Sequence, residues 1–290
     1  MGRHHPRKRF GQHFLHDRRV IEQLIGVIAP ARDETLIEIG PGLGALTVPL
    51  LERQANLIVV ELDRDLIAHL QNLKMRYPGL TVLNQDALTL DLARISHHPS
   101  TADADPLAVT NAGEKCGLAR EKIRIVGNLP YNISSPLLFH FMDQGEYIRS
   151  MTFMLQQEVV DRICAEPNQS DYSRLSVMTQ YYCTVEKRFN VDAAAFSPPP
   201  KVMSSVITLV PKTPETDIDS ALFASIVKQA FSQRRKILKN NLGQWLDTED
   251  YLQLGISPGQ RAQELTLQQF KAMTRHMMSK DQADGEPGCG

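Results

Sequence analysis

The sequence has few cysteines, no long apolar run and almost no net charge. Its four cysteines, Cys116, Cys164, Cys183 and Cys289, show no paired metal-ligand spacing. Such scattered residues are typical of reduced thiols in a cytoplasmic protein. No apolar run is long enough to cross a membrane, and the first residues are too polar for a signal peptide. We therefore expect a cytoplasmic protein that has no membrane partner and no metal.

The near-balance of charge on its own argues against a nucleic-acid partner, but the distribution of the charges reverses that inference. The chain carries 32 Lys and Arg against 33 Asp and Glu, a formal net charge of −1. Two basic clusters stand out, and such clusters neutralise phosphates. The first is Arg3, Arg7, Lys8, Arg9, Arg18 and Arg19, and the second is Lys228, Arg234, Arg235, Lys236 and Lys239. Each cluster alone is equally consistent with a solvated surface.

The segment Asn128-Leu129-Pro130-Tyr131 is the most informative in the chain. It follows an apolar run, 123–126, that has the character of a buried strand. Pro130 stiffens the turn, which presents the amide oxygen of Asn128, the carbonyl of Leu129 and the ring of Tyr131. These groups suit a planar base with an exocyclic amine, because the amine donates two hydrogen bonds and the ring stacks. An ordinary structural turn remains the alternative for this segment taken alone.

An upstream segment has the order strand, glycine loop, helix. Residues 35–39 are apolar and β-prone, Gly40 and Gly42 follow them, and a helical pattern begins at Leu46. This order opens a nucleotide-binding α/β unit, in which glycines allow close approach to a ligand and the helix N-terminus offers N–H groups to an anion. Read loosely, the loop also satisfies the dinucleotide pattern, so NAD stays an alternative cofactor at this point.

Acidic residues follow the next two expected strands. The strand at 57–60 ends in Glu61, where a carboxylate commonly accepts hydrogen bonds from ribose hydroxyls. The strand at 80–83 leads to Asp86, which can accept a hydrogen bond from an adenine amine. The glycine loop, Glu61, Asp86 and Asn128 thus come at the ends of successive strands. Ligands bind at such carboxyl ends in an open α/β sheet, so the four groups together predict one ligand site.

Motifs along nearly the whole chain are similar to those of one family. They are the runs at 7–15 (RKRFGQHFL), 38–42 (EIGPG), 61–63 (ELD), 85–87 (QDA), 127–134 (GNLPYNIS), 153–156 (FMLQ), 172–177 (YSRLSV), 196–202 (FSPPPKV) and 231–236 (FSQRRK). On these motifs the sequence resembles the ribosomal RNA adenine N6-dimethyltransferases, specifically the bacterial small-subunit type (KsgA/RsmA). The resemblance implies a Rossmann-like, doubly wound α/β methyltransferase sheet with a small helical C-terminal domain. It further implies S-adenosylmethionine as cofactor, and dimethylation of N6 of two adjacent adenines in a hairpin loop near the 3′ end of small-subunit (16S) rRNA during ribosome biogenesis.

The resemblance also implies roles for individual residues. The catalytic residues would be Asn128, Leu129, Pro130, Tyr131 and Phe196, with Tyr131 and Phe196 on opposite faces of the target ring. The cofactor would be bound by His13, Leu15, Gly40, Gly42, Glu61, Leu62, Asp86, Ala87 and Asn128. The RNA would be bound by Arg7, Lys8, Arg9, Lys201, Arg234, Arg235 and Lys236. The expected partners are the small-subunit rRNA and the pre-small-subunit ribosomal particle, and the expected state is a monomer.

Two departures from the family pattern are visible. His13 stands where the family most often has Asn; both side chains can hydrogen-bond a cofactor carboxylate or amine, so we expect the role to survive. The segment 97–120 is longer than expected between Asp86 and the fourth strand. Its composition, rich in Ser, Thr, Ala, Asp and Gly, predicts a surface loop.

The expected organisation is a methyltransferase domain over residues 1–210, with an N-terminal basic arm, and a small α-helical RNA-binding domain over 211–290 with a frayed tail. Asp17 is expected to cap a helix that runs to about Ile28. Two final strands, forming a hairpin-like pair that closes the sheet, are expected near 181–189 and 205–210. The helices expected in the second domain span 221–246, 248–252 and 266–278.

Two other function classes remain open from the sequence. A non-catalytic ribosome-assembly factor with a decayed site would bind rRNA, but the intact segment 128–131 and glycine loop argue against decay. An NAD-dependent oxidoreductase would use the same glycine loop, but it leaves 128–131 and the basic clusters unexplained. Among methyltransferases, a large-subunit rRNA or DNA adenine enzyme is the closer rival. The segment 196–202 and the run at 234–236 favour the small-subunit type.

Overall fold

The computed structural model describes residues 13–32, 34–53, 55–95 and 122–285. The chain divides into two compact units. The first consists of Met1–Val160 and Thr184–Pro211, and the second of Asp161–Cys183 and Lys212–Gly290. The loop predicted over 97–120, and the basic residues Arg7, Lys8 and Arg9, lie outside the described residues.

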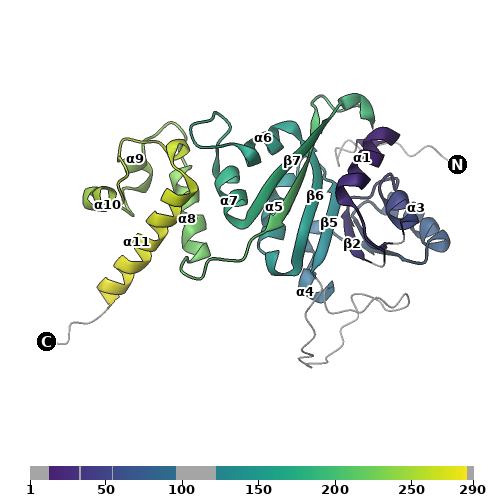
Figure 1. Cartoon of the computed structure of the whole chain (residues 1–290), viewed down its shortest axis with the longest axis horizontal. Coiled ribbons are helices and arrows are strands. Elements are labelled where there is room, and N and C mark those ends of the chain that lie inside the picture. The colour runs from purple at the N-terminus through teal and green to yellow at the C-terminus, as the bar shows by residue number, and fades with distance from the viewer. Residues whose placement is uncertain (1–12, 33, 54, 96–121, 286–290) are drawn as a thin grey trace, which may run out of the picture. The chain divides into compact units, whose positions relative to one another are not determined.

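A seven-stranded sheet forms the core of the first unit (Figure 1). Its strand order is β4 (Leu80–Asn84), β3 (Asn56–Glu61), β2 (Thr35–Ile39), β5 (Ile123–Asn128), β6 (Ile148–Gln156), β9 (Ser204–Pro211) and β7 (Cys183–Val191). Neighbours from β4 to β6 pair in parallel, whereas β9 pairs antiparallel with β6. The order of the parallel strands reverses between β2 and β5, and a ligand crevice opens at such a switch point. The doubly wound α/β prediction is confirmed.

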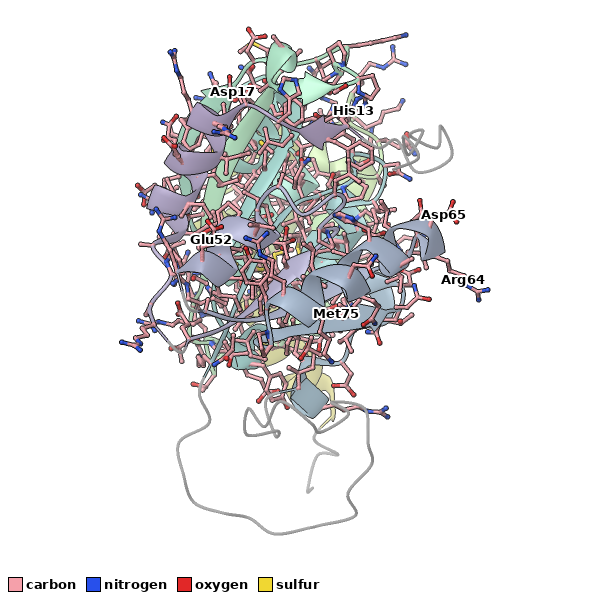
Figure 2. The ribbon with its side chains drawn as sticks, turned by 90° about the vertical axis from the view of Figure 1, so that its right-hand side faces the viewer. His13, Asp17, Glu52, Arg64, Asp65 and Met75 are labelled. Carbon is pink, nitrogen blue, oxygen red and sulfur yellow. The ribbon has the colours of Figure 1, made fainter. Side chains whose placement is uncertain are left out.

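Helices precede, connect and follow the parallel strands of this unit. They are α1 (Arg18–Ile28), α2 (Thr47–Glu52), α3 (Arg64–Arg76), α4 (Leu92–Ile95), α5 (Ser134–Met142) and α6 (Gln157–Cys164), the last of which runs on into the second unit. The predicted cap of α1 is confirmed, because the Asp17 carboxylate accepts hydrogen bonds from the backbone N–H groups of Arg19 (2.8 Å) and Val20 (3.4 Å). Figure 2 shows Asp17 at the start of that helix. In Figure 1, α1 and α3 lie beyond β5 on the side of β2.

The N-terminal segment is tied to a distant part of the first unit by a two-stranded sheet. In it, β1 (Phe14–Leu15) pairs antiparallel with β8 (Phe196–Ser197), with Phe14 opposite Ser197. The short 3-10 helix η4 (Ala193–Ala195) precedes β8, and the backbone N–H of His16 donates to Ala195 O at 3.0 Å. The end of the motif at 7–15 and the start of the motif at 196–202 therefore meet at Phe14–Leu15 and Phe196–Ser197, although no local pattern predicts a strand in either.

The last two strands of the large sheet are close to their predicted positions. The strand predicted near 181–189 is β7, which starts at Cys183 because Tyr181 and Tyr182 complete the helix α7 (Arg174–Tyr182). The strand predicted near 205–210 is β9. It lies between β6 and β7, so these two final strands are neighbours and close one side of the sheet.

The second unit is helical and includes a segment that the sequence did not indicate. Besides α7 it contains α8 (Ser220–Ala230), α9 (Leu238–Leu242), α10 (Thr248–Gln253) and α11 (Leu267–Gly285). Residues 161–183 belong to it because their aromatic side chains pack on its other helices. Tyr172 contacts Phe231 edge-on, with ring centroids 6.2 Å apart, and Tyr181 stacks on Phe223 at 4.1 Å. None of the helices described is long and apolar enough to cross a membrane.

The prediction of a single helix over 221–246 is wrong. The chain leaves the helical conformation after Ala230 and resumes it at Leu238. The side-chain amide of Asn241 donates to Ala230 O (2.7 Å) and to Gln233 O (3.2 Å), which satisfies carbonyls at the end of α8. The backbone N–H of Leu238 donates to Gln260 O at 2.8 Å. These non-local partners replace the helical hydrogen bonds, so Arg234, Arg235 and Lys236 lie in a turn. The last helix, in contrast, is longer than predicted and continues to Gly285.

Candidate active site

A cavity of about 540 Å³ opens in the first unit at the carboxyl ends of β2, β3 and β5. The residues that line it come from the regions that follow β2, β3, β4 and β5 and from the two-stranded sheet of β1 and β8. The lining residues are His13, Phe14, Leu15, His16, Glu38, Gly40, Pro41, Gly42, Leu43, Ala45, Leu46, Glu61, Leu62, Leu66, Asp86, Leu88, Asn128, Leu129, Pro130, Tyr131, Asn132, Ile133 and Ser197. The structure thus brings most of the sequence-predicted cofactor and catalytic residues to one place.

The glycine loop after β2 forms one wall of this cavity. Gly42 has a φ of 58°, a left-handed conformation that L side chains rarely adopt. A Cβ atom at Gly42 would also lie only 3.2 Å from two ring carbons of Phe14. Glycine is therefore required here both for the turn and for the close approach of the N-terminal segment.

The carboxylate of Glu61 is held at the end of β3 by the backbone that follows it. Its Oε1 accepts hydrogen bonds from the N–H groups of Leu62 and Asp63, both at 2.9 Å. Burial raises the pKa of Glu61, because the residue is only 8% exposed, and this outweighs the opposing effect of the hydrogen bonds from Asp63, Gly42 and Leu62. Glu61 thus offers a fixed, partly desolvated acceptor to a ligand.

Asp86 is oriented in a similar local way at the end of β4. Its Oδ1 accepts a hydrogen bond from Leu88 N at 2.9 Å and caps the 3-10 turn η2 (Ala87–Thr89). This turn directs Leu88 to the cavity, whereas Ala87 is buried and is not among the lining residues. Leu88 therefore lines the cavity where Ala87 was expected, and the cofactor contact of Ala87 stays a prediction.

Glu38 is a functional candidate that the sequence analysis did not single out. It lies in β2, lines the cavity and is 2% exposed. The hydroxyl of Thr47 donates to its Oε2 at 2.7 Å. Burial raises the pKa of Glu38 to about 8, and the nearby charge of Glu61 adds to this. A signal was present in the sequence, since Glu38 is a lone acid in an otherwise apolar strand immediately before the glycine loop.

The turn after β5 is fixed by segments from elsewhere in the first unit. The side-chain Nδ2 of Asn128 donates to His13 O at 3.2 Å. The amide oxygen Oδ1, on the opposite side of the planar amide, is thus the atom left to accept a hydrogen bond from a ligand. The backbone N–H of Leu129 donates to Met154 O at 3.1 Å. The hydroxyl of Tyr131 lies 2.8 Å from Ser204 Oγ, and burial raises the Tyr131 pKa.

His13 lies in the cavity wall, and its imidazole contacts both the turn after β5 and the segment after β8. Its Nδ1 lies 2.7 Å from Pro198 O, and its ring stacks on that of Tyr131 with centroids 5.7 Å apart and planes 28° apart. Figure 2 labels His13 beside the short strand β1. The cofactor contact predicted for His13 is compatible with its place in the lining, and the structure adds a contact with Tyr131 that the sequence did not reveal.

Phe196 is not brought to the cavity. Its side chain is 2% exposed and belongs to the hydrophobic core with Leu15, Ala195 and Val206. Its neighbour Ser197 lines the cavity instead. Because side chains alternate along a strand, β8 turns Phe196 into the core when Ser197 faces the cavity. The expectation that Phe196 faces the cavity is therefore wrong in this structure, and its stacking on the target base stays a prediction.

The candidate RNA-binding residues that the structure describes are all exposed. Lys201 follows β8 in the first unit. Arg234, Arg235 and Lys236 lie in the turn between α8 and α9 of the second unit, where the Arg234 guanidinium donates to Ser170 O.

Among the described residues there is no cluster of His, Cys, Asp and Glu that could hold a metal ion.

The cavity has the features that an adenosine-bearing cofactor requires. The glycine loop leaves room for backbone approach, Glu61 offers an acceptor for ribose hydroxyls, and Asp86 offers one for an adenine amine. Leu62, which is 49% exposed, gives an apolar surface for a ring at the same wall. A second group of acceptors, around Asn128, lies in the same cavity and suits the amine of a base to be modified.

Comparison with known proteins decides between the possible cofactors and chemistries. The model of the ribosomal RNA adenine dimethylase family matches residues 3–278. The chain belongs to this family. It is therefore an S-adenosylmethionine-dependent methyltransferase that acts on ribosomal RNA, and the NAD-dependent oxidoreductase alternative is removed.

Curated relatives agree with the family over almost the full length. The chain is 45% identical to a ribosomal RNA small subunit methyltransferase A of Bordetella bronchiseptica, over 99% of this chain and 98% of the relative. It is 46% identical to the protein of the same name from Aromatoleum aromaticum, over 97% of each.

Solved structures of lower identity share the fold. The dimethyladenosine transferase from Plasmodium falciparum is 22% identical, with a TM-score of 0.72, and the match covers 94% of this chain and 98% of that one. The 23S rRNA methyltransferase ErmE is 24% identical, with a TM-score of 0.64, over 91% and 99%. These likenesses show that the chain shares the fold of these methyltransferases.

Proposed function

We propose that this dimethylase converts N6 of two adjacent adenines in a hairpin loop near the 3′ end of small-subunit rRNA to N6-dimethyladenosine. The observation that carries the proposal is the meeting of two sets of acceptors in one cavity, Glu61 and Asp86 on one side and Asn128 and Leu129 on the other. The names of the curated relatives support the small subunit as the substrate.

Residues at the ends of β2, β3 and β4 would hold the cofactor. Glu61 would accept hydrogen bonds from the ribose hydroxyls, and Asp86 would accept one from the adenine amine, with Leu62 and Leu88 flanking the adenine ring. Gly40 and Gly42 leave space for the rest of the molecule. When bound, S-adenosylmethionine supplies an electrophilic methyl group on a sulfonium centre.

The residues at the end of β5 hold the target amine in a reactive geometry. The N6 lone pair of adenine is delocalised into the ring, so the amine is a poor nucleophile. Asn128 Oδ1 and Leu129 O accept its two hydrogen bonds, which favours a pyramidal nitrogen whose lone pair faces the methyl group. Positive charge grows on N6 during the attack, and the two carbonyl dipoles stabilise it. No general base is required, because the product ammonium is acidic enough to lose its proton to water.

Tyr131 stacks on the target base and holds it across both transfers. Base–aromatic stacking contributes about 1–3 kcal/mol per base. With Phe196 in the core, the ring of Tyr131 is the aromatic surface that we assign to the target base at this end of the cavity. The space around Asn128 must accept one methyl group where a hydrogen stood, because the second transfer starts from the monomethylated base.

We propose that Lys201 and the run Arg234, Arg235 and Lys236 bind rRNA phosphates, and that the second unit is an RNA-binding domain. Neutralising the run of three should weaken RNA binding and lower its salt slope by up to about three units, if each contacts one phosphate. Cofactor affinity should stay the same. An unchanged salt slope, measured by fluorescence anisotropy with an rRNA fragment, would show that the run is only a solvated surface.

We propose a cytoplasmic location, because the substrate is ribosomal. We further propose that the partner is the pre-small-subunit particle and that the enzyme acts on it as a monomer.

The test of the proposed reaction is to incubate the protein with methyl-labelled S-adenosylmethionine and with small subunits that lack the modification, and to map the labelled bases. Large subunits serve as the parallel substrate, and Asn128→Ala controls for contaminating activity. Label in large subunits alone would favour the large-subunit alternative. RNA binding without any label would favour a non-catalytic assembly factor.

A further inference from the structure

The hydroxyl of Tyr131 is anchored to a residue that lies outside every sequence motif. Ser204 Oγ lies 2.8 Å from the Tyr131 hydroxyl, across 73 positions of sequence. Ser204 is fully buried, with 0% of its surface exposed, whereas Tyr131 is only partly buried and lines the cavity. A buried hydroxyl needs a hydrogen-bond partner, so the pair is a built contact and not a chance approach at the surface.

Ser204 is held by the central sheet. It is the first residue of β9 and pairs with Gln156 at the end of β6. The residue before it, Met203, accepts a hydrogen bond from Gln157 N at 3.0 Å. Ser204 Oγ is therefore a fixed point, whereas Tyr131 belongs to a turn after β5 and depends on side-chain contacts for its orientation.

The Tyr131 ring is held at two places. The hydroxyl contacts Ser204, and the imidazole of His13 lies against the ring with centroids 5.7 Å apart. A ring fixed at its far end and covered by His13 on one face can offer only its other face to a base. The tilt of that face determines where the N6 atom of a stacked adenine lies.

We propose that Ser204 is a positioning residue for methyl transfer, which acts by fixing the tilt of the Tyr131 ring and through it the place of the target amine. This inference rests on the proposed function, in which Tyr131 stacks on the target adenine. A misplaced amine lies off the line of attack, so the loss should appear in kcat more than in KM. We expect Ser204→Ala to lower kcat about 3–10-fold, the size of one neutral hydrogen bond.

The next residue supplies a matched control. Ser205 lies on the same strand and is also 0% exposed, but its Oγ donates to Asn190 Oδ1 at 2.7 Å. Ser205→Ala removes the same atom from the same buried strand without touching Tyr131. A general loosening of β9 should therefore affect both variants alike, whereas positioning of Tyr131 should affect Ser204→Ala alone.

The kinetic test compares Ser204→Ala, Ser205→Ala, Tyr131→Phe and the double variant Ser204→Ala with Tyr131→Phe. Rates are measured with labelled S-adenosylmethionine and small subunits that lack the modification, and cofactor affinity is measured by calorimetry. We expect all variants to bind the cofactor with equal affinity and Ser205→Ala to have a normal kcat. The double variant should be no slower than the slower of its two single variants, because Ser204→Ala and Tyr131→Phe remove the same hydrogen bond. Effects that multiply, or equal losses in Ser204→Ala and Ser205→Ala, overturn the proposal. If Ser204→Ala does not fold, Tyr131→Phe breaks the same bond from its partly exposed side, and a normal kcat for it overturns the proposal.

A second measurement needs no RNA. The protein is labelled with 13C at the Cζ atoms of its seven tyrosines, and the Tyr131 resonance is assigned by its loss in Tyr131→Phe. Ser204→Ala should shift this resonance and Ser205→Ala should leave it in place. If the wild-type protein methylates no rRNA, the proposed function fails and the inference fails with it. If the wild-type protein methylates rRNA but the Tyr131 resonance does not move in Ser204→Ala, the inference alone is overturned.

Discussion

The two ends of the cavity are held in different ways. At the cofactor end, the carboxylates accept hydrogen bonds from the backbone one or two residues further on, as Glu61 does from Leu62 and Asp63, and Asp86 from Leu88. At the base end, Asn128 is bonded to a residue 115 positions away and Tyr131 to one 73 positions away. The cofactor end is thus a product of local structure, whereas the base end exists only when distant segments of the first unit meet. We expect distant mutations to disturb the chemistry more readily than cofactor binding.

The largest effect is expected at the base end, from Asn128→Ala. This change removes the proposed acceptor for the target amine and the contact with His13 O. Loss of one positioned group that stabilises a transition-state charge typically costs about 10²–10³ in rate. Single-turnover transfer from labelled S-adenosylmethionine measures the loss, and RNA binding by the second unit should stay nearly intact. A normal rate of dimethylation would show that the active site has been placed wrongly.

At the cofactor end, Glu61→Ala should weaken binding of S-adenosylmethionine by about 1.5–3 kcal/mol, the range for a hydrogen bond to a charged group. Isothermal titration calorimetry measures the affinity. Glu52→Ala is the control, because Glu52 is an exposed carboxylate on α2 outside the cavity lining, and Figure 2 labels it. Equal affinities for the two variants would mean that Glu61 does not hold the ribose.

Glu38 should make the cofactor end sensitive to pH. Its pKa is about 8 in the folded protein, against 4.5 for an ordinary glutamate, so between these values the folded state binds more protons than the unfolded state. The free energy of unfolding therefore falls as pH rises from about 4.5 to 8, by an amount on the order of a few kcal/mol. Glu38→Gln keeps an acceptor for Thr47 and removes this titration.

The cofactor-free Glu38→Gln variant should thus gain stability relative to wild type as pH rises. Urea unfolding of both proteins at a pH of about 5.5 and of about 8.5 measures the difference, and the contributions of other titrating groups largely cancel in it. A difference that is the same at both pH values would contradict the raised pKa of Glu38.

The smallest effect is expected from His13→Asn, which keeps a hydrogen-bonding side chain at this position. The change removes the ring that stacks on Tyr131, and an aromatic pair contributes about 0.5–1.5 kcal/mol. KM for the RNA substrate should rise by up to about tenfold, while affinity for S-adenosylmethionine stays within about twofold. The opposite result, a normal KM with weaker cofactor binding, would assign His13 to the cofactor end.

The features that the sequence predicts correctly depend on short stretches of chain. A brief apolar run followed by glycine or an acid marks a strand and its end, and the carboxyl ends of neighbouring parallel strands share one edge of a sheet. The sequence alone therefore places the strand ends at Gly40, Glu61 and Asn128 in one cavity. The same reasoning applies to the helix cap at Asp17, whose partners are two and three residues away.

The features that the sequence does not predict depend on contacts between distant segments. The motif around Phe196 suggests a contact with the target base, but whether an aromatic faces a core or a cavity depends on the pairing of β8 with β1, which no local pattern encodes. The break after Ala230 depends on Asn241 and Gln260, which take the places of helical hydrogen-bond partners. Residues 161–183 show no composition change that would assign them to the second unit.

The pairing of Phe14 with Ser197 has a consequence for a chain that is still being synthesised. The ribosome adds roughly 5–20 residues per second, so the N-terminal strand waits on the order of ten seconds or more for its partner to emerge. During that time the glycine loop and the strand that carries Glu61 have already left the exit tunnel. The residues of the nucleoside-binding wall therefore emerge first, and the site for the base can be completed only when nearly the whole first unit has been made.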